Sequence, residues 1–68
     1  MSSIYSEMSV ADRLIYARGK KSQQEVADAV GVSKNAVSKY ESGEMIPADR
    51  IKKKLAEYFD MSIEALFF

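Results

Sequence analysis

The chain has 68 residues, a length that permits one domain with a modest hydrophobic core. It contains neither Cys nor His, so a disulfide framework, the usual zinc sites and the commonest acid–base side chain are excluded. Ten basic and ten acidic side chains give a formal net charge of zero, which argues against a strongly basic nucleic-acid binder. No apolar run is long enough to span a bilayer, and the first residues do not resemble a signal peptide.

The N-terminal part of the chain is expected to be a short tail followed by a first helix. Residues 1–8 have no anchor in the predicted core, so we expect a flexible segment, or a short arm that contacts a partner chain or DNA. Ser9 is placed to cap a helix that ends at about Arg18. The inward face of this helix is formed by Val10, Leu14 and Ala17.

Two short helices joined by a tight turn are predicted between Ser22 and Gly43. Ser22 begins an S-x-x-E capping box that Glu25 completes. Gly31 stops the first of these helices at a position that favours a left-handed residue, and Ser33 is placed to cap the second. The apolar residues that recur at helical spacing are Val26, Ala27, Val30, Val32, Val37 and Tyr40.

The second of these helices, over about residues 33–42, divides into two arcs at 100° per residue. The inner arc is mostly apolar and consists of Ala36, Val37, Tyr40 and Glu41. The outer arc holds only side chains that donate hydrogen bonds, namely Lys34, Asn35, Ser38 and Lys39. A helix that buries one side and presents such donors on the other is typical of contact with a polar partner.

The C-terminal third of the chain predicts two more helices. Pro47 opens a fourth helix, whose apolar face is formed by Ile51, Leu55, Tyr58 and Phe59. Asp60 or Ser62 caps a short last helix that carries Ile63, Leu66, Phe67 and Phe68. Because the chain shows neither β-type alternation nor an internal repeat, we predict an all-α fold of five helices around one small core.

The central pair of helices resembles the helix-turn-helix of the lambda-type phage repressor and Cro family of transcriptional regulators. The matching residues are Gln23 at the helix start, small Ala27 where two helices approach, and Gly31 in the turn. The pattern continues through Glu41-x-Gly43, Pro47, Ile51, Leu55-Ala56 and Ser62-Ile63-Glu64-x-Leu66, and it covers roughly residues 11–67. The resemblance implies a lambda-repressor-like DNA-binding domain over residues 9–68.

The resemblance also implies contacts with double-stranded DNA. It places Lys34, Asn35 and Lys39 against base edges in the major groove, and Ser38 shares their arc. It places Gln23 against a phosphate, where the helix N-terminus adds amide donors and a favourable dipole. The full set of expected phosphate contacts is Gln23, Gln24, Ser33, Arg18, Lys20 and Lys21.

The charge distribution agrees with this interpretation better than the net charge does. The segment from Arg18 to Lys39 holds five basic residues (Arg18, Lys20, Lys21, Lys34 and Lys39) against two acidic ones (Glu25 and Asp28).

Arg18 has two possible roles. It matches a family Arg that pairs with the residue corresponding to Glu41, and such a pair would tie the first helix to the recognition helix. Alternatively, Tyr16 occupies that space and leaves Arg18 for a phosphate.

A dimer is expected because one such module reads only a few base pairs, and the family binds two half-sites as a two-fold dimer. The chain ends on Leu66, Phe67 and Phe68, which a monomer would rather hide, so we predict that the last helix provides the dimer contact. The alternative is that Phe67 simply completes the core. The function predicted in this way is a transcriptional regulator, most simply a repressor, bound to a two-fold operator.

Other functional classes are less well supported. We expect no enzyme, because the sequence offers no catalytic set, and we expect no cofactor, metal or small-molecule ligand. A helical protein-interaction module is the stronger alternative, because folds are reused and because the acidic Glu44 stands where relatives place basic residues. An antitoxin or restriction–modification controller of the same fold is another. We expect a cytoplasmic location, associated with the nucleoid in a bacterial host.

Overall fold

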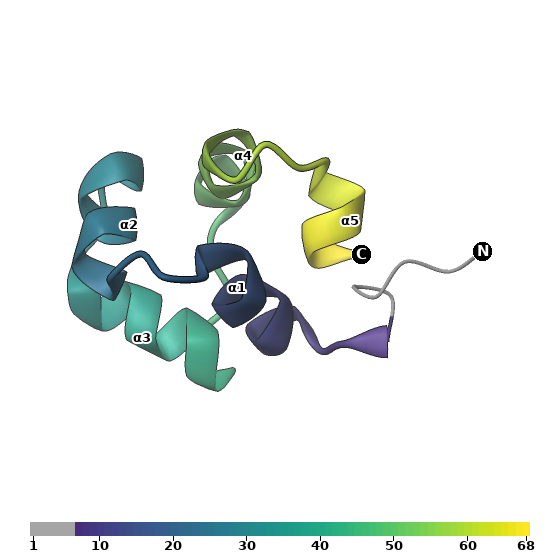
Figure 1. Ribbon diagram of the computed structural model, residues 1–68, viewed down its shortest axis with the longest axis horizontal. Coiled ribbons are helices and arrows are strands. Elements are labelled where there is room, and N and C mark those ends of the chain that lie inside the picture. The colour runs from purple at the N-terminus through teal and green to yellow at the C-terminus, as the bar shows by residue number, and fades with distance from the viewer. Residues whose placement is uncertain (1–6) are drawn as a thin grey trace.

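Five α-helices make up the computed structural model, which describes residues 7–68 (Figure 1). They are α1 (Val10–Arg18), α2 (Gln23–Val30), α3 (Lys34–Ser42), α4 (Asp49–Tyr58) and α5 (Ile63–Phe67). Residues 7–68 contain no strand, so the predicted all-α, five-helix fold is confirmed. Most of the expected flexible segment, residues 1–6, lies outside the described part of the chain. No helix within that part combines the length and apolar character needed to cross a membrane.

Serine caps fix where most of the helices begin. The Ser9 hydroxyl accepts the backbone N–H of Asp12 at the start of α1, at 3.1 Å, and Ser33 and Ser62 do the same for α3 and α5. Ser22 forms the complete capping box at the start of α2. Each cap contributes about 1 kcal/mol of helix stability. These boundaries therefore follow from residues within one turn of each helix start.

The start of α4 differs from the prediction. Pro47 does not open the helix, because Ala48 is the N-cap, with an extended backbone, and the helix begins at Asp49. The ring of Pro47 is instead buried ahead of the cap. Proline at this point removes no helical hydrogen bond, and the residue is buried rather than exposed on a first turn.

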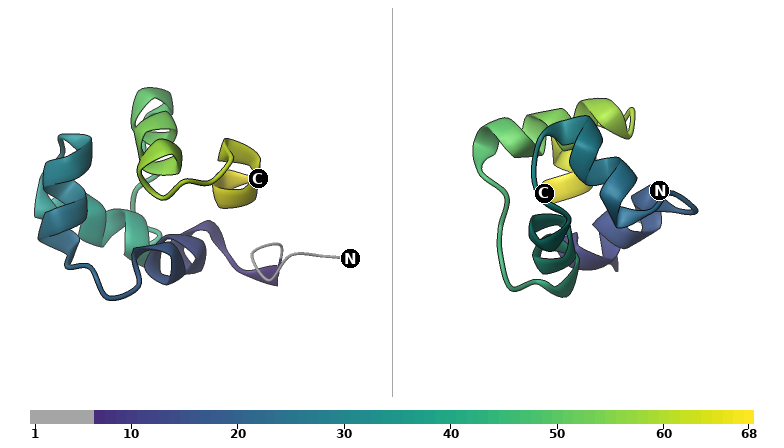
Figure 2. Two further views of the ribbon diagram at one scale, coloured as in Figure 1. Left: turned by 45° about the horizontal axis from the view of Figure 1, so that its top comes forward. Right: turned by 90° about the vertical axis from the view of Figure 1, so that its left-hand side faces the viewer.

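The core brings together apolar side chains from all five helices. Its central members are the fully buried Val26, Val30, Leu55 and Leu66. In the arrangement of the helices, α2 packs against α3 and α4, while α1 packs against α3 and α5. Figures 1 and 2 show α2 and α3 side by side at one end of the molecule, with α5 at the opposite end.

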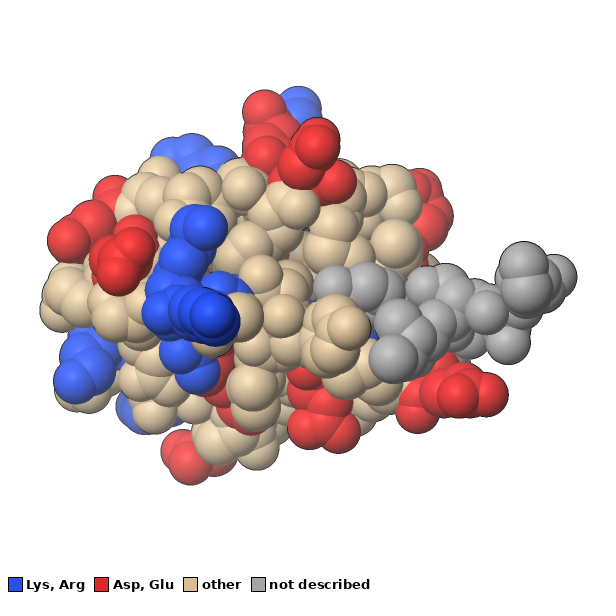
Figure 3. All heavy atoms as spheres, viewed as in Figure 1, with Lys and Arg blue, Asp and Glu red and all other residues tan. Residues whose placement is uncertain are grey.

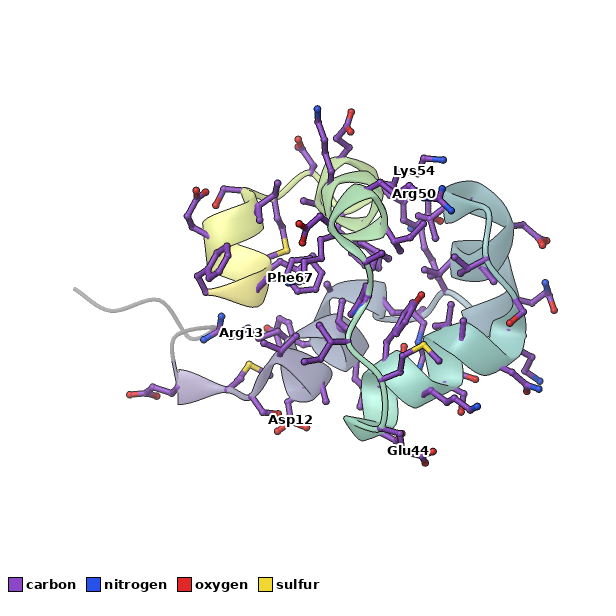
Figure 4. The ribbon with its side chains drawn as sticks, turned by 180° about the vertical axis from the view of Figure 1, so that it is seen from behind. Asp12, Arg13, Glu44, Arg50, Lys54 and Phe67 are labelled. Carbon is purple, nitrogen blue, oxygen red and sulfur yellow. The ribbon has the colours of Figure 1, made fainter. Side chains whose placement is uncertain are left out.

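The last helix corrects one prediction. Leu66 has no exposed surface and Phe67 is only 8% exposed, so both belong to the core of this chain and not to a surface that could form a dimer. Phe67 points from α5 toward the interior (Figure 4). With both apolar side chains turned inward, the short helix closes the core at that end. Phe68, at 79% exposure, is the one member of the predicted dimer set on the surface.

Candidate nucleic-acid interface

The outer arc of α3 is exposed, as its sequence predicts. Lys34, Asn35, Ser38 and Lys39 are all exposed to solvent. On the opposite side of the helix, Val37 and Tyr40 are buried in the core. The helix therefore presents a polar row of donors on an element whose other face is held by packing.

The position of α3 is set by the turn that joins it to α2. Gly31 adopts the left-handed conformation, with φ of 77°, which an L-residue with a side chain rarely adopts. The N–H groups of Gly31 and Val32 both donate to the carbonyl of Ala27, at 2.9 and 3.0 Å. Ala27 itself is completely buried. The resemblance to the repressor family implies that its small side chain lets the two helices approach closely. The turn between the two helices is thus fixed by a left-handed glycine and by two hydrogen bonds to one carbonyl.

Three polar residues predicted to contact phosphates lie at or near helix N-termini. Gln23 and Gln24 are the first two residues of α2, where backbone N–H groups have no acceptor within the helix. The side chain of Gln24 donates to Asp28 of its own helix, at 2.8 Å. Ser33 is exposed, and its hydroxyl accepts the N–H of Ala36 while keeping its own hydrogen for another partner.

The guanidinium of Arg18 is engaged within the chain, which favours the ion pair over the predicted phosphate contact. Its Nε donates to Glu41 Oε2 at 2.7 Å and its Nη2 to Glu41 Oε1 at 3.1 Å, while Nη1 donates to the carbonyl of Lys21 at 2.8 Å. The hydrogen bond to the Glu41 carboxylate raises the pKa of Arg18. The alternative role, an ion pair that ties α1 to α3, is therefore confirmed. The fork geometry makes this pair stronger than a single contact.

The other basic residues of the segment remain on the surface. Lys20 and Lys21 are exposed, and the Lys21 ammonium lies 5.9 Å from the centre of the Tyr58 ring on α4. In Figure 3 most of the visible Lys and Arg atoms lie on the left, with acidic atoms among them. The basic residues of this side come from α3 and the segment that joins α1 to α2, whereas α2 itself carries only the acidic Glu25 and Asp28. A chain with no net charge thus has a locally basic side.

One charged residue in the core was missed at the sequence level. Arg13 is buried, and it donates to the carbonyls of Met8 at 3.0 Å and Ala65 at 3.4 Å. Its position three residues after Val10 and four before Ala17 places it on the inward stripe of α1, so helical periodicity carried the signal. Arg13 ties α1 to α5 and takes no part in the candidate interface.

The loop between α3 and α4 is acidic and apolar at its surface. Glu44 points outward from it (Figure 4), and Ile46 is 77% exposed. Beside Ile46 lies an open groove of about 450 Å³. The groove is lined by side chains of α1, α3, α4, α5 and this loop, including Val10, Tyr40, Met45, Lys52 and Phe67. No group of three His, Cys, Asp or Glu side chains in residues 7–68 is placed to hold a metal ion.

Comparison of the sequence with known proteins identifies a family and a relative. The sequence model of a family described as helix-turn-helix matches residues 13–66 of the chain. The chain belongs to this helix-turn-helix family. The resemblance to phage repressors and Cro-like regulators is also supported by a relative, the cryptic phage CTXphi transcriptional repressor RstR of Vibrio cholerae serotype O1 (strain ATCC 39315 / El Tor Inaba N16961).

The helix-turn-helix protein described here is 36% identical to that repressor over 61 residues. The match covers 87% of this chain and 54% of the repressor, so the chain spans about half the length of that relative. No solved structure matches the chain significantly. The region matched by the helix-turn-helix family model includes α2, the turn and α3, which are the elements that carry the candidate interface.

Proposed function

We propose that this helix-turn-helix protein is a sequence-specific transcriptional regulator that binds double-stranded DNA with α3 in the major groove. The observation that carries the proposal is the exposed row of Lys34, Asn35, Ser38 and Lys39 on a helix whose opposite face is buried. Membership of the helix-turn-helix family and the similarity to a phage transcriptional repressor support it. The major groove of B-DNA accepts one α-helix and displays a different donor and acceptor pattern for each base pair.

The side chains of the row suit base edges. Lysine donates to O6 and N7 of guanine, and asparagine forms two hydrogen bonds with N6 and N7 of adenine. Lys34, Asn35 and Lys39 take these roles, and Ser38 completes the row. A well-formed contact of this kind contributes about 1–3 kcal/mol of discrimination against the wrong base.

The start of α2 provides the contacts that position the protein on the DNA backbone. Gln23 and the amides of the first turn face one phosphate, and Gln24, Ser33, Lys20 and Lys21 add contacts around it. These contacts carry no sequence information, but they release counterions, so affinity falls as salt concentration rises. Arg18 is omitted from this set because Glu41 and the Lys21 carbonyl engage its guanidinium.

A helical protein-interaction module is the competing function. The zero net charge and the exposed Glu44 favour it, because both weaken attraction to a polyanion. A gel-shift assay at two salt concentrations separates the two functions, since only DNA binding gives a shifted duplex that weakens with salt. An antitoxin or restriction–modification controller of the same fold would also bind DNA. The DNA sequence that this protein selects would distinguish these biological roles.

The direct test of the proposal is selection of bound duplexes from a random DNA pool. We expect enrichment of a short motif, repeated in inverted orientation, because each α3 reads only a few base pairs. Recovery of unenriched sequences, at a salt concentration where the protein is folded, would contradict sequence-specific binding.

Variants at Asn35 and Gln23 are expected to have different effects on DNA binding, the first on sequence preference and the second on overall affinity. Asn35→Ala should lose about 1–3 kcal/mol of preference at one base pair, because it removes a base contact. Gln23→Ala should weaken selected and unrelated duplexes by the same factor, because it removes a phosphate contact. Fluorescence anisotropy titrations against the selected duplex and a set of its single-base variants measure both effects. If the two effects were exchanged, the docking of α2 and α3 proposed above would be wrong.

The regulator is also proposed to act as a homodimer, which would account for a two-fold operator. With Leu66 and Phe67 in the core, the surface that suits a second copy is the exposed apolar set of Met45, Ile46 and Phe68. Met45 and Ile46 line the groove beside the α3–α4 loop, and Phe68 directly follows Phe67, which also lines it. A side chain of one copy would therefore enter the groove of the other. A bound dimer would block transcription by covering the promoter.

Sedimentation equilibrium tests this dimer surface. We expect the wild-type chain to associate at high micromolar concentration, and Ile46→Ser to shift the equilibrium toward monomer by about tenfold, because it removes a largely exposed apolar side chain from a hydrophobic contact. Ile15→Ser is the matched control, since Ile15 is exposed on α1 and does not line the groove. A monomer at every concentration would contradict the dimer, and equal effects of both variants would contradict this surface.

A further inference from the structure

Glu41 joins three segments of the chain at one point. It lies near the C-terminus of α3, yet its carboxylate contacts Arg18 at the end of α1 and Gln23 at the start of α2. Its Oε1 accepts from two donors, Arg18 Nη2 at 3.1 Å and Gln23 Nε2 at 2.9 Å. The Glu41 side chain is 7% exposed, so this network is largely shielded from water.

The ion pair alone does not account for the contact with Gln23. A buried carboxylate needs compensation, and the guanidinium of Arg18 supplies it with two hydrogen bonds. The amide of Gln23 is neutral, and as the first residue of α2 it would otherwise be free to adopt several rotamers. The 2.9 Å hydrogen bond from Nε2 to Glu41 restricts that freedom. A side-chain amide has two N–H donors, so one remains for another acceptor.

We propose that Glu41 is a positioning residue for DNA binding, which holds the Gln23 amide in the orientation that meets a phosphate of the DNA backbone. The inference rests on the proposed DNA-binding function. Glu41 does not contact DNA itself, and Arg18 neutralises its charge so that it does not repel the phosphate. The same carboxylate belongs to α3, so the phosphate contact of α2 is held in register with the recognition helix.

The consequence is energetic coupling between Glu41 and Gln23. A phosphate contact from a side chain that is already ordered avoids the loss of rotamer freedom on binding. When the acceptor at Glu41 is removed, Gln23 must be ordered by the DNA, and its contribution to affinity falls. Neighbouring residues in one hydrogen-bond network show this kind of non-additivity.

A double-mutant cycle tests the proposal. The background variant is Arg18→Met with Glu41→Met, which removes both charges together, keeps the net charge at zero and leaves no buried charge unpaired. Binding of the selected duplex is measured by anisotropy for Gln23→Ala in the wild-type chain and in this background. We expect Gln23→Ala to weaken binding about tenfold in the wild-type chain, and less than twofold in the background, where Gln23 has lost its acceptor.

Glu41→Gln, with Arg18 retained, is the conservative rescue. Its amide oxygen can still accept from Gln23, so Gln23→Ala should again weaken binding several-fold, although the Glu41 charge is gone. Thermal unfolding of each variant shows whether it is folded. If the Met background fails to fold, two measurements supply the test. One is the effect of Gln23→Ala in the Glu41→Gln variant. The other is solvent exchange of the Gln23 side-chain amide protons in the free wild-type chain, which should be slowed.

Each outcome has a definite meaning. Equal losses from Gln23→Ala in all backgrounds, or unprotected Gln23 amide protons, would overturn the positioning role while leaving DNA binding intact. If Gln23→Ala did not weaken DNA binding by the wild-type chain while Asn35→Ala still relaxed specificity, Gln23 would not contact a phosphate. That result would also overturn the positioning role. Absence of any binding by the wild-type chain would instead reject the proposed function itself.

Discussion

Leu66→Ala is expected to destabilise the fold by about 2–5 kcal/mol, because it removes a fully buried side chain and leaves a cavity. In a chain of 68 residues this loss is a large part of the total stability, so much of the protein should be unfolded near physiological temperature. Urea unfolding followed by circular dichroism at several protein concentrations measures the effect.

Phe68→Ala is the matched control for Leu66→Ala. Phe68 lies two residues further along the chain and is largely exposed, so at low protein concentration, where the chain is monomeric, its removal should change stability by less than about 0.5 kcal/mol. The loss caused by Leu66→Ala should be independent of protein concentration, because the cavity lies within one chain. A loss that disappears at high concentration would show that Leu66 acts at an interface between chains, as the sequence alone predicts.

Ala27→Leu is expected to cost about 1–3 kcal/mol of stability and to abolish specific DNA binding. Ala27 is completely buried on α2, and its carbonyl accepts two N–H groups from the turn that leads to α3. We expect its small side chain to let α2 and α3 approach closely. A larger side chain there must push the helices apart, since packed interiors do not absorb added volume without strain. The displaced α3 would no longer reach base edges while α2 remains on its phosphate. Unfolding and gel-shift assays on the same preparation separate these two effects.

Ala29→Leu provides the comparison for Ala27→Leu. It makes the same substitution on the same helix, and both residues are good helix formers, but Ala29 is exposed. We expect it to change neither stability nor affinity appreciably. If Ala27→Leu left binding intact in a folded protein, then close approach of α2 and α3 would not be needed for recognition.

Local features of the sequence were sufficient to predict the helices and the polar face of α3. Ser9, Ser22, Ser33 and Ser62 each cap a helix by a hydrogen bond to a residue three positions ahead, so the signal lies within one turn. The 3.6-residue period likewise separates the buried Val37 and Tyr40 from the exposed arc. Pro47 was misplaced because a proline is compatible both with the first turn of a helix and with the residue before a cap.

What only the tertiary structure decided is which distant residues meet. Arg18 had two possible partners, and the choice of Glu41, 23 residues away, depends on how α1 docks against α3. The burial of Leu66 and Phe67, and the reach of Arg13 across 52 residues to Ala65, depend in the same way on where α5 closes the core. Capping and periodicity act over three or four residues and can be taken directly from the chain. Contacts between helices depend on the packing of the whole core, which no short stretch of sequence specifies.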